Sequence, residues 1–60
     1  MTTFTVPVVE DRYFNFRRWL VARDPEARIS IRAEGSDIWI CTVQTSKLYL
    51  KRPSMRRWAL

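Results

Sequence analysis

The residues of this chain whose types and spacing could support chemistry are the lysines and arginines near its carboxyl end. Residues 45–60 hold two lysines and three arginines and no acidic residue, whereas the charges of residues 1–44 cancel. The whole net charge of +5 at pH 7 therefore belongs to residues 45–60. Cations gathered without counter-charges favour the binding of phosphate groups or of acidic protein surfaces.

Two aromatic residues, Tyr49 and Trp58, are interleaved with these cations. An exposed ring can stack on a nucleic-acid base while neighbouring cations neutralise phosphates. We therefore predict a surface that binds nucleic acid or an acidic partner, formed by Arg28, Arg32, Lys47, Tyr49, Lys51, Arg52, Arg56, Arg57 and Trp58. The opposing interpretation is a solvated basic terminus in which Trp58 and Leu60 close over a small core.

Enzymatic chemistry has few candidate residues. The chain has no histidine, the usual general base at neutral pH, and a single glycine cannot form a glycine-rich phosphate loop. One cysteine allows neither an internal disulfide nor a thiolate zinc site. The acidic residues fall at predicted helix ends and turns, where capping explains them. We expect no catalysis, no cofactor and no metal, and an inert buried thiol at Cys41.

The first predicted element is a strand over residues 3–9. Phe4, Val6 and Val8 alternate there with residues of the opposite face, which indicates a half-buried strand. Pro7 has no backbone N–H, so the strand is expected at an edge of its sheet.

Residues 10–23 are predicted to form a helix, because acidic residues favour its first turn and Pro25 follows its end. The apolar residues recur at helical spacing, but Arg17 falls within their sector. Either the stem of Arg17 covers the core while its head reaches water, or residues 13–19 are partly extended.

Three more strands are predicted, at residues 27–33, 38–43 and 47–51, from the alternation of apolar and polar side chains. A turn containing Gly35 joins the first two as a hairpin. Both faces of residues 38–43 are apolar, which is typical of a central strand or of one covered by a partner.

The chain is predicted to end in a short helical turn capped by Ser54, after Pro53 has ended the last strand. The expected fold is α+β, with a three-stranded meander and an N-terminal edge strand packed on one helix. Residues 1–60 then form one small domain with a basic segment at 45–60. Because so short a chain buries little surface, a second hypothesis is a homodimer in which residues 38–43 of each copy complete the core.

We expect a cytoplasmic protein that does not contact a membrane, since the sequence shows neither a leader pattern nor a long apolar run. The predicted function is that of a non-catalytic binding module for nucleic acid. The alternative is a small inhibitor or adaptor of the kind that phages encode, which binds a host protein or a nucleoprotein complex of CRISPR-type defence. This alternative is suggested by the many arginine and aromatic residues of the chain, since these residue types are enriched at binding hot spots.

Overall fold

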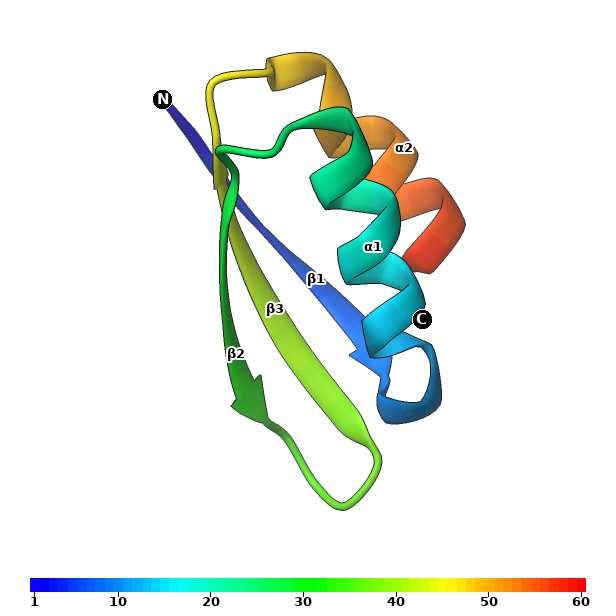
Figure 1. Ribbon diagram of the computed structural model, residues 1–60. Helices are drawn as coiled ribbons and strands as arrows, with labels where there is room; N and C mark the ends of the chain where they lie inside the picture. The colour runs from blue at the N-terminus through cyan, green and yellow to red at the C-terminus, as the bar shows by residue number, and fades with distance from the viewer.

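The computed structural model describes residues 1–60 and shows a three-stranded antiparallel sheet with two helices on one face (Figure 1). The elements are, in order, β1 (Thr2–Val9), η1 (Glu10–Arg12), α1 (Tyr13–Arg23), β2 (Arg28–Ala33), β3 (Ile38–Thr45), η2 (Leu48–Leu50) and α2 (Lys51–Trp58). The elements η1 and η2 are single 3-10 turns that lead into the two helices. The predicted α+β class is confirmed.

The central strand of the sheet is β3, which pairs antiparallel with β1 on one side and with β2 on the other. This confirms that the strand with two apolar faces is a central one. Because β1 and β2 both run antiparallel to β3, they are parallel to each other, and α1 connects them across it. The sheet and α1 thus form a split β-α-β unit.

Two hydrogen bonds at the hairpin end establish how the peptide groups of the sheet are oriented. The N–H of Glu34 donates to the C=O of Ile38 at 2.8 Å, and the N–H of Glu10 donates to the C=O of Asp37 at 2.7 Å. Bonding direction alternates along an antiparallel strand. Even-numbered residues of β1 and β2 therefore bond to β3, and odd-numbered ones point to the free edges. Pro7 points to such an edge and removes no bond from the ladder, so its predicted edge position is confirmed.

The core lies between one face of the sheet and the helices. Its buried apolar side chains are Phe4, Val6, Val8, Tyr13, Phe16, Leu20, Cys41, Val43, Leu50 and Trp58. None of them comes from β2, where Ile29 packs only at the margin and Ile31 is 48% exposed. The helices thus cover β1 and β3 and leave β2 partly open.

The predicted helix and hairpin are confirmed. The 3-10 turn η1 and the helix α1 together occupy residues 10–23. Because α1 is a regular helix from Tyr13 onward, the alternative in which residues 13–19 are partly extended is wrong. The side chain of Arg17 is exposed and stays out of the core. Gly35 has a φ of 85° in the turn between β2 and β3, a backbone conformation that favours glycine.

Residues 47–51 do not form the predicted fourth strand. Residues 48–50 form η2, and α2 begins at Lys51. The hydroxyl of Thr45 accepts a hydrogen bond from the N–H of Lys47 at 3.0 Å, at the point where the chain leaves the sheet. Alternation over only five residues fits a strand and the entry to a helix equally well.

The terminal helix also begins earlier than predicted, so Ser54 is an interior residue of α2 and not its cap. Pro53 lies in the first turn of α2, where backbone N–H groups have no partner within the helix and proline removes no bond. The side chain of Ser54 is fully buried, and its Oγ atom has no hydrogen-bond partner.

A buried polar network joins the end of α1 to the end of β3. One carboxylate oxygen of Asp24 accepts a hydrogen bond from the hydroxyl of Thr45, and the other accepts from the N–H of Glu26 at 3.2 Å. The Nζ atom of Lys47 donates to the C=O of Arg23, the last residue of α1, at 2.8 Å. These bonds fix the start of the basic segment to the carboxyl end of α1.

Candidate functional site

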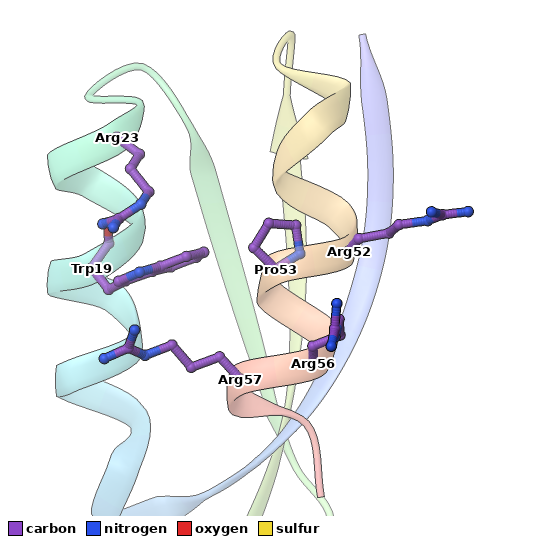
Figure 2. A pocket seen from close by; sticks show the side chains of 6 residues that line it. All are labelled: Trp19, Arg23, Arg52, Pro53, Arg56 and Arg57. Carbon is purple, nitrogen blue, oxygen red and sulfur yellow. The ribbon is translucent and has the colours of Figure 1, made fainter.

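A groove of about 550 Å³ lies between α1 and α2, and arginine is its main lining residue. We call it the arginine groove; its lining residues are Trp19, Arg23, Arg52, Pro53, Arg56 and Arg57 (Figure 2). Four cations and no acidic residue line it. Such a lining favours an anionic ligand.

The helical spacing of the sequence places these side chains. Trp19 and Arg23 are four residues apart and lie on the side of α1 that faces α2 (Figure 2). Pro53 and Arg57 are likewise four residues apart, and Figure 2 shows both on the side of α2 that faces α1. The arginine groove is therefore the seam between two helix faces.

Arg52 and Arg56 form the outer wall of the arginine groove. They are four residues apart on α2, on the side of the helix opposite the buried Ser54. Figure 2 shows the Arg52 side chain directed away from α1 and the Arg56 side chain running along the side of α2 that is turned away from α1. Both residues are exposed and lie outside the buried core.

Two tryptophan rings support the guanidinium groups. The Cζ atom of Arg23 lies 4.4 Å from the ring centroid of Trp19. Trp58 is contacted by two arginines, with Cζ of Arg12 at 4.8 Å and Cζ of Arg57 at 5.6 Å from its centroid. Cation–π contacts of this kind hold a guanidinium group over a ring.

Hydrogen bonds to backbone carbonyls restrain the same groups. Arg12 donates to the C=O of Arg57 at 3.2 Å, and Arg23 donates to the C=O of Trp19 at 3.1 Å. A guanidinium group has five N–H donors, so each arginine keeps donors for a ligand. The arginine groove thus offers guanidinium groups that are partly ordered before any ligand binds.

No acidic side chain neutralises this surface. The single ion pair of the structure joins Arg32 to Glu34 at 3.4 Å, with both side chains exposed, on the far side of the sheet. The carboxylate of Asp24, the acid nearest in sequence to Arg23, is buried and bonded to Thr45. The arginines of the groove are therefore uncompensated, as the charge pattern predicted for the carboxyl-terminal segment.

Some of the predicted binding residues meet at this site. Arg52, Arg56 and Arg57 line the arginine groove. Lys47 lies beside it, half-buried, with its ammonium group on the carbonyl of Arg23. Lys51 is exposed on α2 but does not line the groove.

The two predicted stacking rings differ in position. Trp58 is only 8% exposed and packs against Phe16 and Trp19, with ring centroids 5.8 and 6.2 Å apart. Its predicted availability to a base is wrong, because the short chain needs this ring to close its core. Tyr49 is 64% exposed in η2 and remains a free ring outside the arginine groove.

Arg28 and Arg32 lie apart from the other predicted residues. They are opposite Gln44 and Ile40 of β3, on the face of the sheet turned away from the helices. A strand alternates its side chains between two faces, and the parity of Arg28 and Arg32 is that of the uncovered face. Their predicted place on the same surface as the terminal cations is wrong.

The sequence pattern did not reveal the contribution of α1. Arg12, Trp19 and Arg23 were not predicted as site residues, although positions 12, 19 and 23 lie on one side of a helix. The charges of residues 1–26 sum to zero, so the distribution of net charge along the chain did not identify these arginines as a site. The helical spacing of the three positions is the signal that could have identified them.

Other reactive groups are few. Cys41 is fully buried, and burial raises the pKa of its thiol from 9.0 to about 11, which keeps it protonated near neutral pH. No group of three or more histidine, cysteine or acidic side chains is placed to hold a metal ion. Neither helix has the length and apolar character needed to cross a membrane.

Comparison of the chain with protein-family models, with curated proteins and with solved structures gives no match. The geometry and charge of the arginine groove therefore indicate the function of this chain.

Proposed function

We propose that this chain is a non-catalytic nucleic-acid-binding module that contacts the phosphate backbone through the arginine groove. One observation carries the proposal: four arginines from two helices line one groove, and none of them forms an ion pair. A guanidinium group matches the geometry of a phosphate because it can donate two parallel hydrogen bonds.

The rings of the site support binding to the backbone more than reading of bases. Trp19 and Trp58 each have a guanidinium group over the ring, so they position arginines. Contacts to phosphates fix a protein on nucleic acid but carry no sequence information. The proposed module therefore binds with little preference among sequences of equal length.

The test is the salt dependence of binding, measured by fluorescence anisotropy of a labelled mixed-sequence duplex from about 50 to 300 mM salt. If each of the four groove arginines neutralises one phosphate, log affinity falls against log salt with a slope of about −4. Replacing both Arg52 and Arg56 by glutamine is expected to flatten the slope by about two. These two side chains lie outside the core, so their replacement leaves the fold intact.

A matched control removes the same charge from the opposite face of the sheet. Replacing both Arg28 and Arg32 by glutamine lowers the net charge equally but leaves the arginine groove unchanged. The slope of this variant, expressed per bound chain, is expected to stay at the wild-type value. Equal slopes for the two double variants would refute the assignment of binding to the groove, as would affinity that does not change with salt.

A small inhibitor or adaptor that binds a protein partner is the second candidate function. It is favoured by Leu48 and Tyr49 of η2, each 64% exposed directly before the basic helix. Tyrosine and arginine are enriched at binding hot spots, and an exposed leucine beside them adds apolar surface that a partner can cover. Capture from nuclease-treated lysate separates the candidates: a partner protein that is lost on replacing Leu48 and Tyr49 by serine, with oligonucleotide affinity unchanged, favours this one.

A further inference from the structure

The two edges of the sheet are protected unequally. On the β1 edge, Pro7 offers no N–H, and its C=O accepts a hydrogen bond from the N–H of Leu60 at 3.0 Å. Leu60 and Pro7 thus interrupt the row of free backbone groups along this edge, which hinders pairing with another strand there.

The β2 edge is open. Ile29, Ile31 and Ala33 are the odd-numbered residues of β2, whose N–H and C=O groups point away from β3. No backbone hydrogen bond outside the sheet ladder involves them. An edge with a row of free donors and acceptors is a template for pairing with another chain.

Apolar surface accompanies the open edge. On the helix side of β2, the side chain of Ile31 is 48% exposed, and Val21 of α1 is 39% exposed. A groove of about 470 Å³ lies between α1 and β2, lined by Tyr13, Arg17, Val21, Pro25, Ala27 and Ile29. Pairing at this edge would remove apolar side chains from water as well as satisfy backbone groups.

We propose that β2 pairs antiparallel with β2 of a second copy of this chain, so that the two sheets become one continuous sheet. The two-fold axis passes through the pair formed by Ile31 and its counterpart. Ile29 then lies opposite Ala33 of the second copy, and every edge-facing N–H and C=O of β2 is bonded. This inference is independent of the proposed function.

Charge selects this register among those that the free backbone groups allow. The face of β2 turned away from the helices carries Arg28, Ser30 and Arg32, followed by Glu34. In the proposed register each Arg28 lies opposite Glu34 of the second copy, and each Arg32 lies opposite Ser30. A shift by two residues in one direction places Arg28 opposite Arg32, and a shift in the other direction places the two Arg32 side chains opposite each other. Like charges directly opposite destabilise a strand pair.

The same complementarity favours a second copy over another partner. The β2 edge supplies both members of each opposing pair, arginine at one end and glutamate at the other, so it complements itself under a two-fold rotation. The axis is perpendicular to the sheet because adjacent antiparallel strands keep their side-chain faces in common. The helices of both copies therefore lie on the same face.

A charge-exchange experiment tests the register. Arg28→Glu alone and Glu34→Arg alone each place like charges opposite each other twice in a homodimer, whereas an equimolar mixture of the two variants restores opposite charges at both positions. Sedimentation equilibrium of nucleic-acid-free protein is expected to show dissociation constants raised on the order of tenfold for each variant alone, and a near wild-type value for the mixture. A mixture that associates no better than either variant overturns the register.

A proline experiment tests the edge itself. Ile31→Pro removes a free-edge N–H without removing a hydrogen bond to β3, and it is expected to give a folded monomer. The matched control is Thr5→Pro on the β1 edge, which is expected to leave the dimer intact. A folded Ile31→Pro variant that dimerises like the wild type overturns the proposal, and so does a wild type that stays monomeric up to millimolar concentration. If the proline prevents folding, the charge-exchange experiment decides.

Discussion

The network around Asp24 makes a sharp prediction for Thr45→Val, a substitution that preserves the shape of the side chain and deletes its hydroxyl. The hydroxyl donates to the carboxylate of Asp24 and accepts from the N–H of Lys47. Both Thr45 and Asp24 are buried, so water cannot replace the lost bonds. The variant leaves one carboxylate oxygen and one backbone donor without their partners.

The magnitude follows from those two bonds. A hydrogen bond to a charged group contributes about 1.5–3 kcal/mol, and a neutral one contributes about 1 kcal/mol. Thr45→Val is therefore expected to lower the free energy of unfolding by about 3 kcal/mol. A domain of 60 residues has a total stability of about 3–9 kcal/mol, so the loss is a large share of it. At about 4–8 °C per kcal/mol, the expected fall in Tm is about 12 °C or more.

Urea and thermal unfolding followed by circular dichroism measure the effect, and β3 supplies the control. Thr42→Val makes the same chemical change on the opposite face of the same strand, where no hydroxyl bond is present, and is expected to change stability by less than about 0.5 kcal/mol. Thr45→Ser keeps both bonds and loses one methyl group, at a cost of about 1 kcal/mol. Equal stability of the two valine variants would refute the structural role of the network.

Two further predictions concern buried groups. Ser54→Ala removes a hydroxyl that is fully buried without a partner and adds helix propensity, so urea unfolding is expected to show a gain of about 1 kcal/mol; a loss of stability would contradict this. Burial raises the pKa of the Cys41 thiol from 9.0 to about 11, so the folded state keeps a proton that the unfolded state releases. Stability is then unaffected below pH 9 and falls as the pH rises toward 11, by an amount on the order of 2–3 kcal/mol that Cys41→Ala should lack; parallel pH profiles for the two proteins would contradict it.

Local patterns in the sequence were sufficient for most of the fold. The alternation of β1, the edge position of Pro7, the length of α1 and the turn at Gly35 each depend on residues close together in the chain. The segment from 47 to 51 was different, because the N–H of Lys47 bonds to Thr45, whose hydroxyl bonds in turn to Asp24 of another element. A window of five residues does not contain that information.

The site was predictable only in part for a related reason. Counting charge along the chain identified Arg56 and Arg57, whose surroundings in sequence hold no acid. The same count did not identify Arg23, because the negative charge of Asp24, the next residue, cancels the positive charge of Arg23 in the sum. In the fold the carboxylate of Asp24 turns inward to Thr45 while Arg23 lies over Trp19. Neighbours in sequence can belong to separate electrostatic environments once one of them is buried.

The distribution of tryptophan gives the molecule built-in optical probes. Trp19 lines the arginine groove beneath Arg23, and Trp58 lies beneath Arg12 and Arg57. Trp39 lies near the hairpin, opposite Ala33 of the open edge, with its ring centroid 4.9 Å from that of Tyr13. Emission from the first two rings should respond when a ligand binds the guanidinium groups that lie over them. Emission from Trp39 should respond to events at the β2 edge. Replacing Trp39 by phenylalanine leaves only the rings near the groove, so occupancy of the groove can be followed apart from pairing of strands, without attaching a dye.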